Sequence, residues 1–281
     1  MKHAALWVGC LVLVLTGSVA RAQPAGATLV RAQVLTSTDA VVQGQTFEVG
    51  VLLTIEPKWH VYWSNPGDSG QATTIKWTLP EGFTARPTNY PIPTQFSQPG
   101  DLAGYGYERE VFFTTTVTAP DNLPTGTDVS VSADVRWLVC EQVCIPGKAK
   151  LQLTLPVRAS SSPTHGVLFE SAERQRPVDL QNSQVVSTLT SSFDPVTSTT
   201  TLSFTTVEPV PASAITFFPG ANDAIEVQDV KIDGDGLKHS VRVVMKKVDA
   251  DGADAPSLDS LIVVTRAGMD RVGVNVAVPL K

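Results

Sequence analysis

Two cysteines near the middle of the chain are the residues whose type and spacing could support redox chemistry. Cys140 and Cys144 lie in the stretch WLVCEQVCIPG, directly after a strand-like run. A disulfide needs Cα atoms roughly 4.4–6.8 Å apart, whereas four residues of extended strand would separate them by about 13 Å. The pair can therefore bond only if residues 141–143 fold back as a tight turn at the tip of a hairpin.

Such a pair could be a structural clip or a working redox couple. Closing so short a loop stabilises a protein by about 2 kcal/mol, less than the ~3 kcal/mol expected for a loop of fifteen residues. A short pair held at a turn is also more readily exposed and reduced than a disulfide between distant strands. The residues alone leave both alternatives open.

Other kinds of site have little support in the sequence. A zinc site is disfavoured because His60, His165 and His239 form no spaced motif with the cysteines. The sequence has no Gly-x-Ser-x-Gly elbow and no phosphate-binding loop, and its acidic residues are scattered, so hydrolase chemistry is not indicated. We interpret His60 as a hydrogen-bonded structural histidine, and we expect neither a metal nor a cofactor.

The N-terminus indicates export. Lys2 and His3 precede the apolar run of residues 4–15, and Ala20-Arg21-Ala22 offers a cleavage site, so residues 1–22 are predicted to be a signal peptide. No later stretch reaches the ~20 apolar residues that a membrane-spanning helix needs, so we expect a periplasmic protein without direct membrane insertion. In the oxidising compartment outside the cytoplasm, a cysteine pair can persist as a disulfide.

The charge balance limits the possible partners. Removing Lys2 and Arg21 with the signal peptide leaves 19 basic residues against 27 acidic ones, a net charge of −8. An acidic exported protein is a poor binder of nucleic acids and of anionic membrane surfaces. Partners of both kinds are therefore not expected.

The whole chain is predicted to be β-structure. Short runs rich in Val, Thr, Leu and Phe alternate with Pro, Gly, Asn and Asp, a pattern typical of β-sandwiches. In residues 129–139 every second position is apolar, which predicts a half-buried strand that ends at Cys140. The other expected strands are Thr28–Thr36, Thr46–Ile55, Trp59–Trp63, Thr74–Leu79, Val111–Thr118, Ala149–Val157, Gln184–Thr190, Thr199–Thr206, Ala214–Phe218, Ile225–Ile232, Leu237–Val248, Leu261–Arg266 and Val272–Val278.

Two sandwich domains are expected, at residues 23–158 and 181–281. The segment between them, residues 159–180, begins with the linker-like sequence ASSSPT. It should contain a short helix from His165 to about residue 175, capped by Thr164. The sequence DGDG at residues 233–236 predicts a hairpin turn in the second domain.

Residues 82–108 form the longest stretch without a clear strand pattern. They contain four prolines and four glycines. Loops of this length inside a compact domain are usually functional or disordered, and the aromatic residues of this one argue against disorder. We expect an ordered flap with little regular structure.

Four motifs, PKWHVYWSNPGDSG, YPIP, GYGYE and WLVCEQVCIP, resemble in this order the N-terminal periplasmic domain of the DsbD/ScsB thiol:disulfide interchange reductases. The resemblance covers about residues 28–158, and ASAITFFPG in the second half is similar to the further β region of the ScsB-like branch. It implies an all-β fold of two immunoglobulin-like β-sandwich domains. It also implies that the cysteine pair passes electrons to thioredoxin-fold periplasmic proteins.

The resemblance assigns the redox role to Cys140 and Cys144 alone. It further implies an aromatic cap that shields the pair until a partner docks, and this cap falls within residues 82–108. Inside that segment we assign the cap and the partner-binding surface to Phe96, Tyr105, Tyr107 and Glu108.

The sequence departs from the family in two ways. The best-known members space their cysteines more widely than the Cys-x-x-x-Cys found here, and the family's membrane-embedded and thioredoxin-like domains have no counterpart in this sequence. Electrons are therefore expected from a separate membrane thiol reductase. The alternative is a secreted β-sandwich that acts as a binding or adaptor module, with a purely structural disulfide.

Overall fold

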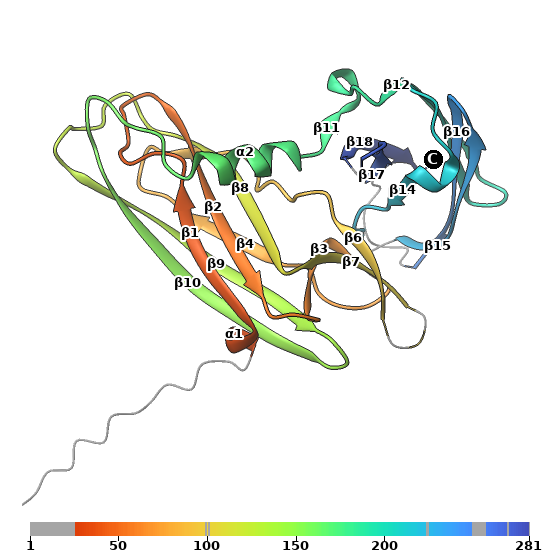
Figure 1. Ribbon diagram of the computed structural model, residues 1–281, viewed down its shortest axis with the longest axis horizontal. Coiled ribbons are helices and arrows are strands. Elements are labelled where there is room, and N and C mark those ends of the chain that lie inside the picture. Colours follow the sequence, from red (N-terminus) through yellow and green to blue (C-terminus); the bar gives the residue numbers. More distant parts are fainter. Residues whose placement is uncertain are drawn as a thin grey trace, which may run out of the picture.

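The computed structural model describes residues 26–98, 100, 102–222, 225–248, 257–268 and 270–280. The expected signal peptide lies outside these residues. Two groups of strands follow one another along the long axis of the molecule (Figure 1). This arrangement confirms the expected all-β fold of two sandwich domains. Within the described ranges, no helix is both long and apolar enough to cross a membrane.

The first domain packs a four-stranded sheet against a six-stranded one. The four-stranded sheet has the order β1 (Val30–Thr36), β2 (Thr46–Ile55), β8 (Glu110–Thr118) and β5 (Thr84–Ala85). The six-stranded sheet has the order β10 (Cys144–Pro156), β9 (Asp128–Cys140), β3 (His60–Gly67), β7 (Leu102–Glu108) and β6 (Thr94–Gln98), with β4 (Thr74–Thr78) also paired to β9.

Strand β9 shows why these residues form a sandwich. Its alternate positions from Val129 to Val139 are all buried, because successive side chains of a strand point to opposite faces. Trp137 and Val135 pack in one core cluster with Val51 and Phe113 of the facing sheet. The half-buried strand predicted at residues 129–139 is therefore confirmed.

The second domain is a sandwich of two four-stranded sheets. One has the order β11 (Val178–Asp179), β18 (Arg271–Pro279), β17 (Ser257–Thr265) and β14 (Ile215–Phe218). The other has the order β12 (Val186–Asp194), β13 (Thr199–Thr206), β16 (Lys238–Lys247) and β15 (Ile225–Asp235). The hairpin predicted at DGDG is confirmed, since Asp235 pairs with Lys238 and Gly236 adopts a φ of +63°.

The helix α2 (Gly166–Arg174) connects the two domains and packs against β8 through the rings of Phe169 and Phe112, 4.9 Å apart. The expected cap by Thr164 is wrong. Its hydroxyl instead donates a hydrogen bond to the Thr36 carbonyl at 2.6 Å. His165 takes the N-cap position without a side-chain bond to the helix, and its Nδ1 lies 3.1 Å from the same Thr36 carbonyl. Because the Thr164 hydroxyl is bonded to strand β1, it does not cap the helix. The other short elements are α1 (Gly26–Leu29), η1 (Leu180–Asn182) and η2 (Ala212–Ala214).

The expectation of little regular structure in residues 82–108 is wrong. This segment contains β5 and the antiparallel pair β6–β7, here called the β6–β7 hairpin. The alternation typical of a strand is not visible in the sequence of β7, because Gly104 and Gly106 occupy positions that leave no room for a side chain. A Cβ atom would lie 2.3 Å from the Phe96 ring at Gly104 and 2.0 Å from the Val61 carbonyl oxygen at Gly106.

Candidate functional site

The cysteine pair lies at the tip of the β9–β10 hairpin. Cys140 ends β9, Cys144 begins β10, and the two are direct cross-strand neighbours. Their sulfurs are bonded at 2.07 Å, with Cα atoms 4.2 Å apart. Residues 141–143 form the tight turn that the spacing required, closed by a hydrogen bond from the Glu141 amide to the Val143 carbonyl at 3.3 Å.

The two cysteine residues differ sharply in exposure. Cys140 is 2% exposed, whereas Cys144 is an exposed residue and Val143 beside it is 62% exposed. Strand β10 lies at the edge of its sheet, so no further strand pairs with the backbone next to Cys144. Cys144 is therefore the cysteine that lies closer to solvent.

A row of side chains crosses the sheet at the level of the disulfide. Cys140 pairs with His60 of β3, and His60 pairs with Glu108 of β7. Side chains of direct cross-strand neighbours share a face, so the imidazole lies beside the buried cysteine. The Phe96 ring packs over this imidazole, with ring centroids 3.9 Å apart.

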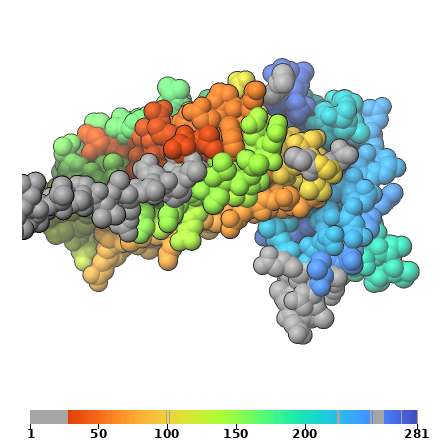
Figure 2. All heavy atoms as spheres, turned by 90° about the horizontal axis from the view of Figure 1, so that it is seen from below, coloured from red at the N-terminus to blue at the C-terminus, as the bar shows by residue number. Residues whose placement is uncertain are grey.

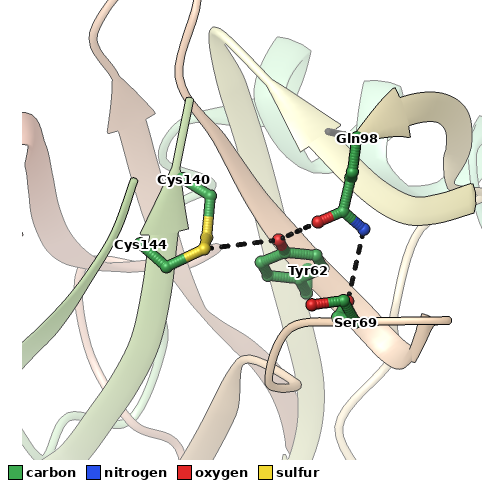
Figure 3. Close-up of a disulfide and its surroundings, with 5 residues drawn as sticks. All are labelled: Tyr62, Ser69, Gln98, Cys140 and Cys144. Atoms are coloured by element: carbon green, nitrogen blue, oxygen red, sulfur yellow. Dashed lines mark hydrogen bonds between the residues drawn. A yellow bond between two sulfur atoms is a disulfide. The ribbon is translucent and has the colours of Figure 1, made fainter. Parts of the chain in front are cut away.

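A chain of hydrogen bonds leads to the sulfur of Cys144 (Figure 3). The Tyr62 hydroxyl lies 4.0 Å from Cys144 Sγ and donates to Oε1 of Gln98 at 2.9 Å. The amide of Gln98 in turn donates to the Ser69 carbonyl at 3.3 Å. Burial raises the pKa of Tyr62, so its hydroxyl keeps its proton at neutral pH.

The turn after β3 allows this arrangement because it contains a glycine. Gly70 adopts a φ of +112° and lies against the Tyr62 ring, where a Cβ atom would come within 2.4 Å of the ring carbons. A side chain here would displace Tyr62, which is fully buried. Gly70, the second glycine of the motif PGDSG, thus leaves room for Tyr62 beside the sulfur of Cys144.

The structure separates the four residues assigned to the cap. Phe96 lies over His60, and Glu108 lies beside His60 at an exposed position. Tyr105 and Tyr107 occupy the opposite face of β7, because successive side chains of a strand alternate. The Tyr107 ring packs against Phe113 in the core at 5.5 Å, and Tyr105 packs against Phe218 of the second domain at 5.3 Å. Neither tyrosine is brought to the disulfide.

Sequence reasoning missed Tyr62 and Gln98 as neighbours of the disulfide. The alternation in KWHVYWS does place His60 and Tyr62 on one strand face and Val61 and Trp63 on the other. That signal becomes useful only when β3 is known to pair with β9 at Cys140, a contact between residues far apart in the chain.

His60 differs from the hydrogen-bonded structural histidine expected from the sequence. Its Nε2 atom is buried and has no hydrogen-bond partner among the described residues. Burial disfavours the charged imidazolium and lowers the pKa of His60 from 6.5 to about 4. The ring beside Cys140 is therefore neutral at physiological pH.

This depressed pKa predicts acid sensitivity. Between pH 6.5 and 4, unfolded His60 is protonated while the folded ring stays neutral, so the unfolded state binds more protons. The free energy of unfolding should therefore fall as the pH drops through this window. His60→Gln should flatten the decrease, as measured by thermal unfolding at pH 7 and pH 4.5. His165→Gln, at an exposed position, is the matched control, and an unchanged slope in His60→Gln would contradict the prediction.

Metal chemistry has no visible basis in the part of the chain that the structure describes. Those residues include no group of three or more His, Cys, Asp or Glu side chains that could hold an ion.

Comparison with known proteins adds the evolutionary context. Residues 31–156 match the family model of the thiol:disulfide interchange protein DsbD, N-terminal. None of the curated proteins compared with the chain matches its sequence. Among solved structures, the N-terminal periplasmic domain of ScsB from Proteus mirabilis superposes with a TM-score of 0.63 at 21% identity, covering 89% of this chain and 94% of that one.

Other solved structures are far less similar. The YadV chaperone covers 87% of this chain and 99% of its own at 15% identity, with a TM-score of 0.22. BcpA, the major pilin subunit of Bacillus cereus, covers 89% and 67% at 9% identity, with a TM-score of 0.29. The match of residues 31–156 to the DsbD N-terminal family model confirms the resemblance inferred from the four sequence motifs, and the ScsB domain shares the fold.

Proposed function

We propose that this protein is a periplasmic thiol–disulfide exchange module. It carries electrons through Cys140 and Cys144, from a separate membrane thiol reductase to thioredoxin-fold partners. The observation that carries the proposal is the unequal exposure of the two cysteine residues, since Cys144 is exposed and Cys140 is only 2% exposed. A purely structural clip has no need of one accessible sulfur, whereas exchange requires a sulfur that a partner's thiolate can reach.

Loading of the module starts from the oxidised pair. A thiolate of the reduced donor attacks Cys144 Sγ, the bond to Cys140 breaks, and the electron pair leaves with Cys140. The donor's second thiolate then attacks the donor sulfur of the mixed disulfide, which releases Cys144 as a thiolate. The donor leaves as a disulfide, and two electrons now reside on the Cys140–Cys144 dithiol.

Unloading runs in the opposite direction. The Cys144 thiolate attacks the disulfide of the acceptor and forms a mixed disulfide. Cys140 then attacks Cys144 Sγ, which restores the internal disulfide and releases the acceptor as a dithiol. Cys140 is held beside its target for this second step, because the two residues are direct cross-strand neighbours.

Tyr62 supports the thiolate intermediates in both directions. Its hydroxyl already lies 4.0 Å from Cys144 Sγ while its proton is directed to Gln98. A thiolate is a stronger acceptor than a neutral amide oxygen, because hydrogen bonds to ionised groups are roughly twice as strong as neutral ones. A small rotation of the hydroxyl would therefore stabilise the charge that appears on Cys144.

The reduction potential of the pair tests the proposal. An exchangeable pair should have a potential above about −300 mV, the range below which structural disulfides of secreted proteins lie. The value can be measured by equilibrating the protein in dithiothreitol buffers, trapping with an alkylating reagent and separating the two forms by mass. A potential below this range would favour the alternative, a binding or adaptor module with a structural disulfide.

A further inference from the structure

Phe218 belongs to strand β14 of the second domain, yet it packs in the core of the first. It is fully buried within the cluster that includes Trp63 of β3 and Tyr107 of β7. Its ring meets the Trp63 ring edge-on at 6.0 Å and the Tyr105 ring at 5.3 Å. The second domain thus places an aromatic ring against the inner face of the β6–β7 hairpin.

Strand β17 continues this contact. Leu261 and Val263 join Phe218 in the first-domain cluster, whereas Ile262 and Val264 point the other way into the core of the second domain. The sequence LIVV from 261 to 264 lacks alternation because this strand is buried on both faces. The hydrophobic core of the first domain therefore extends into the second.

Two polar contacts link the second domain to the start of the hairpin and to β3, the strand that pairs with the hairpin. The Arg271 guanidinium donates a hydrogen bond to the carbonyl of Pro93, the residue before β6, at 2.5 Å. Asn65 donates to the Pro219 carbonyl at 2.7 Å, and its Oδ1 accepts the amide of Gly67, which pairs with Gly104 of β7. Figure 2 shows the yellow surface of the hairpin lying against the blue second domain.

The hairpin needs such support because its own pairing is sparse. Strand β7 pairs regularly with β3 only at His60, Val61 and Tyr62, and an irregularity follows before Gly67. Strand β6 pairs only with β7 and forms the edge of the sheet. Edge strands with few partners are the parts of a sheet that open most easily.

We propose that the second domain holds the β6–β7 hairpin closed over the disulfide, with Phe218 as the positioning residue. The hairpin has two working faces. One face carries Phe96 and Gln98 toward His60 and Tyr62, and the other carries Tyr105 onto Phe218. Loss of the Phe218 ring loosens the inner face and so uncovers Cys140. The purpose of this closure rests on the proposed function, but the closure itself can be measured without any partner protein.

The test measures alkylation of Cys140 in a Cys144→Ser background, where Cys140 is the only thiol of the exported chain. Phe218→Ala should raise the reaction rate with a bulky maleimide by about tenfold, the factor that corresponds to 1.4 kcal/mol. Phe218→Leu, which refills most of the space, should restore the slow rate. Arg271→Ala should raise the rate without altering the aromatic packing.

Phe217→Ala is the matched control, because Phe217 points into the core of the second domain and is absent from the first-domain cluster. At temperatures where thermal unfolding shows each variant to be folded, Phe217→Ala should leave the rate near that of the parent. The proposal is overturned if Phe218→Ala and Arg271→Ala both match the parent rate, or if Phe217→Ala accelerates alkylation as much as Phe218→Ala. These outcomes are independent of the reduction potential, which tests the proposed function separately.

Discussion

Cys140→Ser is expected to trap a mixed disulfide with a partner, whereas Cys144→Ser should trap none. The reason is the difference in exposure, since Cys144 is open to solvent and Cys140 is 2% exposed. With Cys140 removed, Cys144 still forms the mixed disulfide but lacks the neighbouring thiol that resolves it. With Cys144 removed, the remaining thiol is buried. Turnover of electrons should be lost completely in both variants, because each has lost one of the two sulfurs that carry the electron pair.

Trapping can be measured in periplasmic extracts by non-reducing electrophoresis, followed by mass spectrometry of the shifted bands. The double variant Cys140→Ser/Cys144→Ser is the control for adducts that do not involve the pair. We expect the captured partners to be thioredoxin-fold proteins or a membrane thiol reductase. Capture by Cys144→Ser alone would reverse the assigned order of attack. If neither single variant captures a partner and the wild-type pair stays oxidised in cells, the exchange proposal fails.

Phe96→Ala should expose Cys140 by removing the cover from the site. The Phe96 ring packs on His60 at 3.9 Å and on Tyr62 at 5.9 Å, the two side chains that lie beside the cysteines. Truncating a ring in such a contact removes roughly 0.5–1.5 kcal/mol of aromatic interaction together with its buried area. Alkylation of Cys140 by a bulky maleimide, in the Cys144→Ser background, should therefore accelerate by about tenfold or more.

Gln95→Ala provides a control within the same strand. Gln95 precedes Phe96 but is exposed on the other face of β6, so its truncation leaves the cover intact. A small reagent such as iodoacetamide should discriminate less between Phe96→Ala and the parent than the bulky maleimide does. Equal rates for Phe96→Ala and Gln95→Ala with the maleimide would show that the β6–β7 hairpin does not shield the pair.

Local patterns were sufficient to place strands β2 and β9 in the sequence. Strand β2 follows the expected bounds Thr46–Ile55, and β9 differs from its expected bounds by a single residue at each end. The pattern failed for β7, because Gly104 and Gly106 occupy positions where a sandwich strand normally carries larger side chains. Those glycines make room for Phe96 and for β3, a requirement that arises only from the packed structure.

The aromatic motif GYGYE illustrates the same limit at the site. The sequence predicted that its aromatic residues cover the cysteine pair, but it could not assign them to the faces of a strand. The pairing of β7 with β3 directs Glu108 toward the row of Cys140 and His60, and alternation then sends Tyr105 and Tyr107 inward. Of the three aromatic residues assigned to the cap, only Phe96, on the neighbouring strand β6, reaches the site.

The sequence by itself determined the β-sandwich class, the hairpin that carries the cysteines and the chemistry that two sulfurs can perform. These features depend on residue type and on spacing over a few positions, which the polypeptide expresses locally. The tertiary structure alone decided which cysteine is exposed, that Tyr62 lies 4.0 Å from Cys144 across 82 residues of sequence, and that Phe218 packs against Tyr105 of β7. Burial and such contacts arise only when distant strands pair and two domains share one core, because each surface is defined by what packs against it.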